Sequence, residues 1–585
     1  MEFGVTRCVL REGTAGTVYL RADQELQPYA KRMTDRLVHW ARTDPGRIFM
    51  ARRKRNADGT GGDWQQVTYG EALDKARRIG QALVDRGLSP DRPVAILSEN
   101  SLEHALMALG CLYAGVPHCP VSPAYSTISQ DYEKLRHVIN TITPGLVFAT
   151  DESRYGKAAR AAVPQGIEVV FGQPPESEPT PAIDAAMEAT GPDTITKFLF
   201  TSGSTKLPKG VINTHGMWCA NQQQMRQSMP VLALEPPVLV DWLPWNHTFG
   251  GNHDVGLTIY NGGTLYIDDG KPTPAGIGET LRNLREIAPT VYFNVPTGFE
   301  AIAHAMKADP DLRKKLLSRV RMFFYAGAAL AQPVWDLLHE VQEGEVGERI
   351  VMGTGLGMTE SSPFAVFITS PEVKSGYIGL PTPGMELKLV PAEGKTEIRY
   401  KGPNVTPGYW RAPQETAENF DEEGFFKTGD AVLWIDPGDP HKGLKFDGRI
   451  AEDFKLATGT FVSVGPLRAK IIAAGAPYVQ DAVITGLNRN EVGALVFPTA
   501  AARTMEPTAL HAHLQKALNQ LAAQATGSAN RVARLHVLSE PPSIDKGEVT
   551  DKGSINQRAV LKHRDELVQD FHEDRLPATL KPEKT

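Results

Sequence analysis

Apolar positions recur with the periods of helices and strands through the first part of the chain. Residues 68–87 (TYGEALDKARRIGQALVDRG) place apolar side chains at helical spacing, and the run PVAILS that follows is typical of a short buried strand. A second helical pattern, LEHALMALGCLYAG, leads into the Pro-rich PHCPVSPAYS. Residues 67–120 are therefore predicted to form helix, strand, helix and strand in that order.

The same alternation returns between about residues 240 and 352. Four runs are strand-like (VLVDWLP, TLYI, TVYFNVP and MFFYAG) and three are helix-like (ETLRNLREIA, GFEAIAHAM and PVWDLLHEVQ). This pattern predicts a mostly parallel sheet with helices on its faces, and ligands bind at the carboxyl ends of such strands. Between the two regions, residues 164–193 contain PPESEPTP and are predicted to form a surface connection.

The pattern changes twice toward the C-terminus. Short strands and turns (GMELKLV, TEIRYKG, AVLWID and GLKFDG) predict a β-rich subdomain at about 378–448, and a domain-sized segment of mixed pattern follows. We expect an α/β fold with a large N-terminal domain, residues 1–448, in which helices flank mostly parallel sheets. A smaller, mobile α+β domain, residues 449–585, should complete the chain, because 585 residues are too many for one core.

Composition and charge narrow the class of protein. The net charge is −6 and no basic run appears, which argues against nucleic-acid binding. The N-terminus, MEFGVTRCVLREG, does not resemble a signal peptide, and no apolar run is long enough to cross a bilayer. The cysteines have neither metal-binding nor disulfide spacing: Cys8, Cys111, Cys119 and Cys219. We therefore expect a cytoplasmic protein that binds neither nucleic acid nor membranes.

The segment TSGSTKLPKG, residues 201–210, has the composition of an anion-binding loop. Backbone N–H groups in a Gly/Ser/Thr turn form a concave site for phosphate, while hydroxyls add donors and lysines add charge. A Walker A loop needs G-x-x-x-x-G-K-[ST], and Gly203 and Gly210 are too far apart for it. An ordinary hydrophilic turn is the alternative.

Four blocks in this order resemble the adenylate-forming, AMP-binding superfamily, which contains acyl- and aryl-CoA ligases, luciferases and peptide-synthetase adenylation domains. The loop at 201–210 is similar to its phosphate loop. GTGLGMTE at 353–360, FFKTGD at 425–430 and DGRIAEDFKLATGTFVSVGPLR at 447–468 are similar to later blocks, so the resemblance covers nearly the whole chain. The segments GRIAEDFKLATGT and VTDKGSINQR look most similar to feruloyl-CoA synthetases.

The resemblance implies a two-step reaction. A carboxylate attacks the α-phosphate of ATP and pyrophosphate leaves; the thiol of CoA then displaces AMP from the acyl-adenylate. We expect ATP, CoA and Mg²⁺ as cofactors, and an aromatic carboxylic acid, ferulate or a related hydroxycinnamate, as substrate. A fatty or other acyl-CoA ligase is the alternative enzyme, and a non-catalytic relative that binds nucleotide or acyl ligands is the alternative outside catalysis. Homodimer formation stays open.

The resemblance also assigns the nucleotide site. The candidates for the β- and γ-phosphates are Thr201, Ser202, Gly203, Ser204, Thr205 and Lys209. Thr359 would donate to the α-phosphate and Glu360 would hold Mg²⁺. Asp430 would accept from the two ribose hydroxyls, with Arg449 as a donor to the sugar or the phosphate. Taken alone, Thr359 and Glu360 could be a helix N-cap followed by an acid, and T-G-D could be a turn.

The acyl site is assigned in the same way. LPWNHTFGGNH, residues 243–253, resembles the family's aromatic block, with His247 as the contact on the carboxylate side, although a structural histidine is the alternative. Phe249 and His253 would both face the pocket if the block is helical. Four small residues should line the adenine and acyl slot: Gly327, Ala328, Gly353 and Gly355.

Two departures from the family pattern affect the nucleotide pocket and the hinge. Leu356 stands where the family has an aromatic residue, so one stacking partner for adenine would be missing. Ala451 stands where the hinge residue is normally Asp or Lys, so the hinge would lie at Glu452 or Asp453 or would need no charge.

The third departure concerns the adenylating lysine. The family places it after a glycine near the C-terminus, where this chain has Ser554. Lys552, which precedes that glycine, is the candidate, and Lys546 is a less favoured one. The alternative is that no equivalent exists and that these lysines are solvated turn residues.

Overall fold

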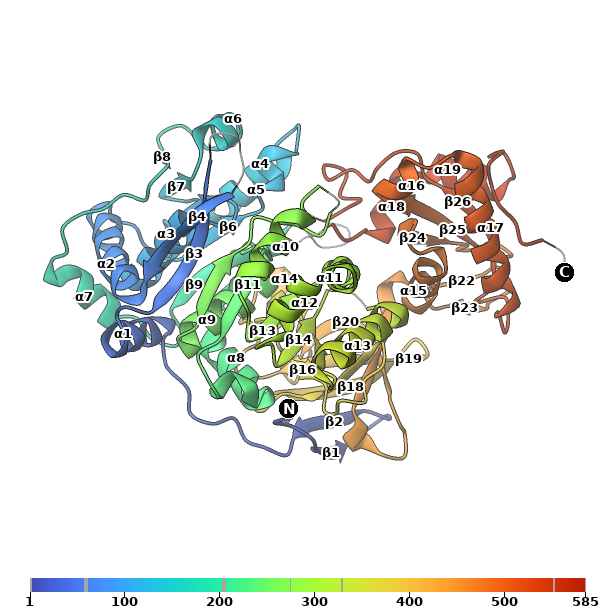
Figure 1. Cartoon of the computed structure of the whole chain (residues 1–585), viewed down its shortest axis with the longest axis horizontal. Coiled ribbons are helices and arrows are strands. Elements are labelled where there is room, and N and C mark those ends of the chain that lie inside the picture. The colour runs from blue at the N-terminus through green and yellow to red at the C-terminus, as the bar shows by residue number, and fades with distance from the viewer. Residues whose placement is uncertain are drawn as a thin grey trace.

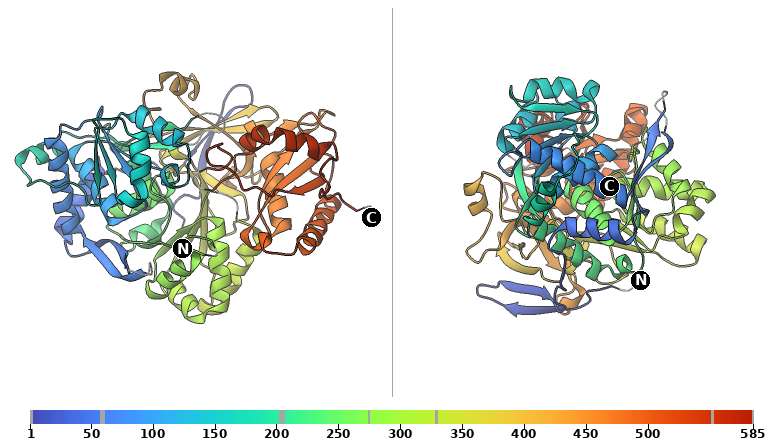
Figure 2. Two further views of the ribbon diagram at one scale, coloured as in Figure 1. Left: turned by 90° about the horizontal axis from the view of Figure 1, so that it is seen from above. Right: turned by 90° about the vertical axis from the view of Figure 1, so that its left-hand side faces the viewer.

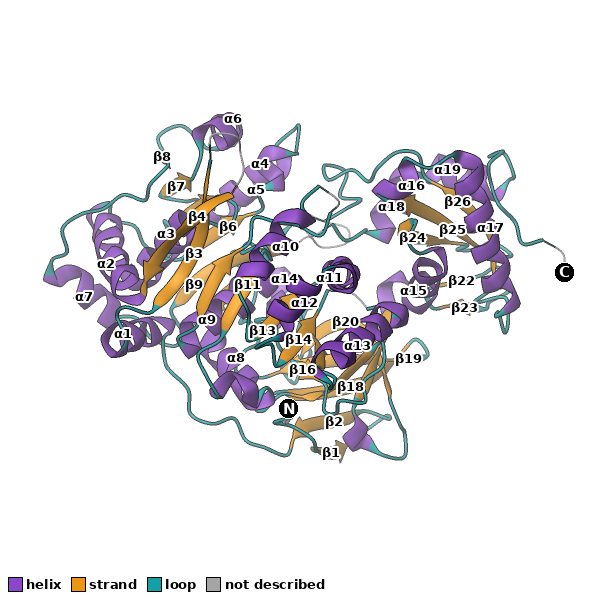
Figure 3. Ribbon diagram, in the orientation of Figure 1, coloured by secondary structure: helices purple, strands orange, loops and turns teal. Residues whose placement is uncertain are grey.

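The chain forms a large N-terminal body with a smaller C-terminal unit at one end (Figures 1 and 2). The computed structural model describes residues 3–56, 61–201, 207–273, 275–327, 330–550 and 553–583. Helices lie on the faces of the sheets in both parts (Figure 3). The predicted α/β class, with a larger N-terminal and a smaller C-terminal part, is therefore confirmed.

The first predicted alternation builds a six-stranded sheet with the order β10-β9-β6-β5-β7-β8. Its strands are β5 (Val94–Leu97), β6 (His118–Val121), β7 (Leu146–Ala149), β8 (Glu168–Phe171), β9 (Ile195–Thr201) and β10 (Lys209–Thr214). Helix α2 (Tyr69–Asp85) begins where predicted, because Thr68 and Glu71 form a reciprocal capping box. Helix α3 (Leu102–Ala114) follows β5 and ends at Gly115, which adopts a left-handed φ of 67°.

The second predicted alternation is divided between two further sheets. Its helices are confirmed as α10 (Ile277–Glu286), α11 (Pro296–Ala308) and α13 (Gln332–Val346). Its first two strands, β11 (Val238–Asp241) and β12 (Thr264–Ile267), are parallel, and β12 pairs with β3 (Ile48–Arg55) and through it with β4 (Gly61–Thr68). The parallel strands β13 (Val291–Asn294), β14 (Met322–Tyr325) and β15 (Val351–Leu356) form one end of an eleven-stranded sheet. Periodicity predicts strands but not these distant pairings, so the expectation of one sheet here was wrong.

The rest of the eleven-stranded sheet is antiparallel and contains the predicted β-rich subdomain. Its strands are β16 (Val366–Phe367), β17 (Tyr377–Pro381), β18 (Glu386–Ala392), β19 (Lys395–Lys401), β20 (Phe426–Trp434) and β21 (Leu444–Arg449). The N-terminal hairpin of β1 (Cys8–Glu12) and β2 (Val18–Ala22) joins this sheet through β18. This fixes the chain's beginning to the subdomain that precedes the C-terminal unit.

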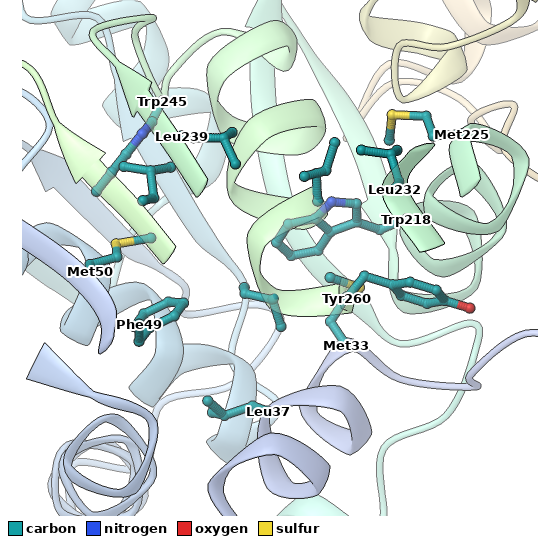
Figure 4. Close-up of a cluster of buried hydrophobic side chains, with 14 of the residues drawn as sticks. Met33, Leu37, Phe49, Met50, Trp218, Met225, Leu232, Leu239, Trp245 and Tyr260 are labelled. Carbon is teal, nitrogen blue, oxygen red and sulfur yellow. The ribbon is translucent and has the colours of Figure 1, made fainter. Parts of the chain in front are cut away.

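The largest core lies between these sheets and the helices around them. Figure 4 shows part of it, in which side chains from widely separated segments meet around Trp218. Trp218 belongs to α8 (His215–Ser228) and Tyr260 to α9 (Val255–Asn261). The labelled side chains are Met33, Leu37, Phe49, Met50, Trp218, Met225, Leu232, Leu239, Trp245 and Tyr260. Burial of such apolar area is the main favourable contribution to folding.

The C-terminal unit has its own core. Strands β24 (Val479–Thr485), β25 (Val492–Pro498) and β26 (Val532–Val537) form a three-stranded sheet. Helices α15 (Val464–Gly475) and α17 (Pro507–Ala523) bury Leu467, Leu514 and other apolar residues against it. Within the described ranges, no helix is both long and apolar enough to cross a membrane.

Candidate active site

The two ends of the predicted phosphate loop lie side by side. Thr201 ends β9, Lys209 begins β10, and these two residues are partners in the antiparallel pair. Ser202, Gly203, Ser204 and Thr205 lie outside the described residues. The Lys209 ammonium is 4.1 Å from the centre of the Tyr409 ring, and the N–H of Trp410 donates to the carbonyl of Gly210 at 2.8 Å. The segment at 409–410 therefore holds the end of the loop.

Glu360 is buried and fixed by the same segment. It is 5% exposed, and the Tyr409 hydroxyl donates to its Oε1 at 2.8 Å. Burial, with the adjacent Glu360 charge, raises the pKa of Tyr409, so its hydroxyl stays protonated and donates. Thr359 starts a single 3₁₀ turn, Thr359–Ser361, and Met358 is the residue that precedes it, so the alternative of a helix N-cap at Thr359 was wrong.

The residues around Glu360 fit a magnesium ion that is shared with a substrate. Mg²⁺ in phosphoryl sites is usually held by one or two carboxylates together with phosphate oxygens and waters. Among the residues with described positions, no group of three or more His, Cys, Asp or Glu side chains could hold a metal by itself. Glu360 would thus supply one carboxylate, and the other ligands would come from ATP and water.

Asp430 and Arg449 face each other across two strands. They are Cα partners in the β20–β21 pair, and Arg449 Nε lies 3.4 Å from Asp430 Oδ1. Burial raises the pKa of Asp430 to about 6, and the charges of Glu452 and Glu360 also raise it, whereas Arg449 lowers it. Asp430 is part of a strand, so the alternative of an isolated turn was wrong. The fold therefore places the Asp430 carboxyl beside Arg449 on two interior strands of the eleven-stranded sheet.

Only the second half of the predicted acyl block is helical, and its helix is of the π type. Residues Phe249–Asp254 form this π-helix, and α9 continues it. The rings of Phe249 and His253 meet edge to face at 5.3 Å between centroids, as their predicted i,i+4 spacing requires. His247 is half-buried, and its Nδ1 accepts from the Phe249 N–H at 3.3 Å.

Side chains from outside the block stabilise this unusual helix. A π-helix leaves carbonyl groups out of the i→i−4 pattern. Lys197 Nζ donates to the carbonyl of Gly251 at 3.0 Å, while Trp218 Nε1 and Gln222 Nε2 donate to that of Asn252 at 2.8 and 2.9 Å. Lys197 is buried, which lowers its pKa well below the ordinary value, and its amine lies over the Trp218 ring. No motif identifies Lys197 from the sequence, because only the fold brings its side chain to the carbonyl of Gly251.

The predicted small residues have different surroundings. Gly327 is exposed after β14 with a φ of 91°, and the closest atom to an added Cβ there would be Val295 Cγ1 at 4.0 Å, so it borders open space. A Cβ on Gly353 would lie 3.0 Å from the Phe324 ring, and one on Gly355 would lie 2.1 Å from the Val366 carbonyl. Gly353 and Gly355 therefore allow neighbouring strands to pack closely. Ala328 lies outside the described residues, and Leu356 is half-buried at the end of β15.

The C-terminal unit contacts the N-terminal body next to the phosphate loop. Helix α5 (Glu133–Ile142) carries Lys134, whose Nζ donates to the carbonyl of Ile544. One turn later, His137 Nε2 lies 2.7 Å from the carbonyl of Pro208 and must donate to it. The helix thus connects the phosphate loop with the segment that precedes the predicted lysine. Lys546 of this segment is exposed, and Lys552 lies outside the described residues.

The hinge region forms a single turn between the two parts. Ala451 and Glu452 belong to the 3₁₀ turn Ile450–Glu452. Asp453 follows, with its side chain fully buried and its Oδ2 2.5 Å from Lys395 Nζ of β19. Its other oxygen accepts from the N–H of Val464, the first residue of α15, at 2.8 Å. Asp453 therefore bonds to both parts of the chain.

Comparison with known proteins identifies the family. The sequence model of the AMP-binding enzyme family matches residues 37–410, and that of the AMP-binding enzyme C-terminal domain matches residues 454–575. Long chain acyl-CoA synthetase 6, peroxisomal, of Arabidopsis thaliana is 25% identical over 496 residues, 73% of this chain and 68% of the relative. Long-chain-fatty-acid–CoA ligase 1 of Homo sapiens is 25% identical over 471 residues, 68% of this chain and 65% of the relative.

A solved structure has the same fold. The anthranilate CoA ligase AuaEII in complex with anthranoyl-AMP superposes with a TM-score of 0.71 at 18% identity, over 94% of this chain and 99% of that one. The two family models together match both parts of the chain, and the first alone matches more than half of it. The chain therefore belongs to the AMP-binding enzyme family.

Proposed function

We propose that the chain is an ATP-dependent acid–thiol ligase that converts an aromatic acid, ferulate or a related hydroxycinnamate, into its CoA thioester. In the first step a carboxylate oxygen of the acid bonds to the α-phosphorus of ATP, and the bond to the β-phosphate breaks. In the second step the sulfur of CoA bonds to the acyl carbon, AMP leaves and the thiol proton is released.

The residues at the nucleotide site suit this chemistry. Both steps move negative charge between oxygens, so fixed donors and a cation should supply much of the catalysis. Lys209 and the hydroxyl of Thr359 would bind the phosphates, and Asp430 would accept from the ribose hydroxyls. Mg²⁺, when bound at Glu360, would neutralise charge on the phosphates. We propose Lys552 as the lysine that stabilises the first transition state, and a boundary near 448 for the unit that carries it.

A buried cluster of aromatic rings at the proposed acyl site is the observation that supports an aromatic acid. Beneath the open edge at Gly327 lie aromatic rings that are at most 6% exposed and pack edge to face, with Phe249, Phe293 and Phe324 among them. At the end of the proposed acyl site, these rings would close the path that a long acyl chain needs. Such a wall would suit a flat ring, because edge-to-face contacts with further rings are favourable.

A fatty acyl-CoA ligase is the second candidate, and it is favoured by the names of the sequence relatives. The Arabidopsis and human relatives are long-chain enzymes by name, at 25% identity. At that level of identity, the residues of an acyl pocket can differ while the nucleotide site is kept. The side chains that line the site must therefore decide between the two candidates.

Release of pyrophosphate with different acids tests the proposal. The purified chain is supplied with ATP, Mg²⁺, CoA and ferulate, p-coumarate, caffeate, benzoate or a medium- or long-chain fatty acid, and the thioester is detected by mass spectrometry. We expect thioester formation with the hydroxycinnamates at a kcat/KM at least about tenfold above that with fatty acids. A preference for a fatty acid would overturn the aromatic assignment, and no pyrophosphate release with any acid would indicate a non-catalytic relative.

A further inference from the structure

His253 has one satisfied and one unsatisfied ring nitrogen. Its Nδ1 lies 2.6 Å from Oδ1 of Asp254, and the two side chains are 1% and 0% exposed. Its Nε2 is buried and has no hydrogen-bond partner among the residues that the structure describes. A buried polar atom without a hydrogen-bond partner destabilises the folded chain, so its presence needs an explanation. A ligand that pairs with the atom when bound is one such explanation.

The unsatisfied nitrogen belongs to the aromatic end wall of the acyl site. The imidazole lies 4.8 Å from the Phe293 ring and 5.3 Å from the Phe324 ring, between centroids. Side chains two residues apart on a strand share a face, so Val295 and Ala326 continue the same faces outward from Phe293 and Phe324. Both are half-buried.

The spacing of residues along these strands sets the depth of the proposed acyl site, measured from Gly327 to the aromatic rings. Ala326 precedes Gly327 at the open edge, and two residues of a strand span about 7 Å. An acid whose carboxylate lies near Gly327 would therefore carry its distal ring toward His253. A ring joined to the carboxylate by a short linker matches this span better than a carboxylate attached directly to the ring.

The protonation of Nε2 depends on two buried carboxyl groups on the Nδ1 side of the imidazole ring. Asp241 lies within hydrogen-bonding reach of Asp254, and Asp241 Oδ1 accepts from the Leu243 N–H at 3.0 Å. Burial raises the pKa of both carboxyl groups well above the ordinary value, and burial lowers the pKa of His253 to about 3. Burial thus favours the neutral form of each of the three groups.

A neutral chain of hydrogen bonds could run in two directions, and we infer the one in which Asp241 donates, because its Oδ1 already accepts from the Leu243 N–H. In that direction the carboxyl of Asp241 would donate to Asp254, and the carboxyl of Asp254 would donate to Nδ1 of His253. Because Nδ1 then accepts, the imidazole proton is on Nε2. The end wall therefore presents a single N–H donor within a surface of aromatic carbon.

We propose that His253 is a specificity-determining residue, whose Nε2–H donates a hydrogen bond to an oxygen substituent on the distal ring of the acid substrate. The inference rests on the proposed aromatic substrate and adds the kind of ring that is accepted. A hydroxyl or methoxy oxygen would satisfy the donor. A methyl group at the same position would leave it unpaired, which costs more than the hydrogen bond gains.

A matched series of para-substituted cinnamates tests this. We would measure kcat/KM for the methoxy, hydroxy, methyl and unsubstituted acids with the wild type and with His253→Phe and His253→Gln. In the wild type, the methoxy acid should exceed the methyl acid by about ten- to a hundredfold. In His253→Phe this ratio should fall to about one while the unsubstituted acid is still converted, and His253→Gln, which keeps an N–H donor, should retain part of the preference.

The outcomes separate the two proposals. Equal rates with methoxy and methyl acids in the wild type, or an unchanged ratio in His253→Phe, would overturn the role of His253 while the aromatic ligase stands. A preference for hydroxyl over methoxy that His253→Phe abolishes would show that Nε2 accepts rather than donates, and would also overturn it. No conversion of any aromatic acid would overturn the proposed function together with the inference. If His253→Phe does not fold, the wild-type series and His253→Gln still decide.

Discussion

Replacing Asp430 by asparagine should stabilise the folded chain at alkaline pH while it weakens nucleoside binding. Burial raises the pKa of the Asp430 carboxyl from 3.8 to about 6. The folded chain therefore holds this proton more tightly than the unfolded chain, and stability is lost as the pH rises from about 4 through about 6. A shift of about two units corresponds to about 3 kcal/mol, fully expressed above about pH 7. This figure already includes the pair with Arg449, which is 62% exposed and lowers the pKa of Asp430.

Thermal unfolding and adenosine binding measure the two effects. Asp430→Asn should melt a few degrees above the wild type at pH 8, and about half of the gain in stability should remain at pH 5. Adenosine has no phosphate to titrate, so its affinity for the wild type should fall as the pH drops through about 6, and the variant should bind it at least about tenfold more weakly. A stability gain that is equal at both pH values, or unchanged adenosine affinity, would refute the reasoning.

Three further substitutions test other parts of the site. Lys552→Ala should slow pyrophosphate release by more than about a hundredfold yet leave thioester formation from supplied acyl-adenylate intact. Lys546→Ala is the matched control, and equal losses in both half-reactions would reject the role of Lys552 in the first one. Tyr409→Phe removes the donor to Glu360 and should raise the Mg²⁺ concentration for half-maximal rate several-fold, and an unchanged Mg²⁺ titration would contradict this. Lys134→Ala removes a contact to the C-terminal unit and should lower the rate of the first half-reaction about fivefold without affecting the second; a uniform loss would instead indicate general destabilisation.

Sequence patterns predicted individual helices and strands because the signals for each element lie within that element. Helix α2 follows from its apolar spacing and from the Thr68–Glu71 capping box, and both can be read within a few residues. Which strands pair is decided by packing between distant segments. Strand β12 pairs with β3, and the N-terminal hairpin joins β18, without any matching signal in the sequence.

The residues of the candidate site also fall into two groups: those that motifs identify and those that only the fold brings together. Glu360, Asp430 and Arg449 were named from motifs, and the structure places Asp430 beside Arg449. Tyr409 was missed, because an isolated tyrosine carries no motif and only the fold brings its hydroxyl to Glu360. The π-helix was missed for a related reason. Its spacing matches an ordinary helix, and what distinguishes it is the set of distant donors led by Lys197.

Asp453 constrains how the two parts of the chain could rotate. Its carboxylate bonds to Lys395 in the N-terminal body and to Val464 in the C-terminal unit. A rotation before Asp453, at Ala451 or Glu452, would separate it from Lys395, and breaking a buried ion pair is costly when one charge stays unpaired. Lys395 would not be left unpaired, because its Nζ also donates to the Asp447 carbonyl at 2.6 Å and lies 3.5 Å from that residue's carboxylate. Exchange between two acidic partners would thus lower the cost for Lys395, and Asp453 would keep its bond to Val464. We therefore expect that a turn at Ala451 needs no charged hinge residue.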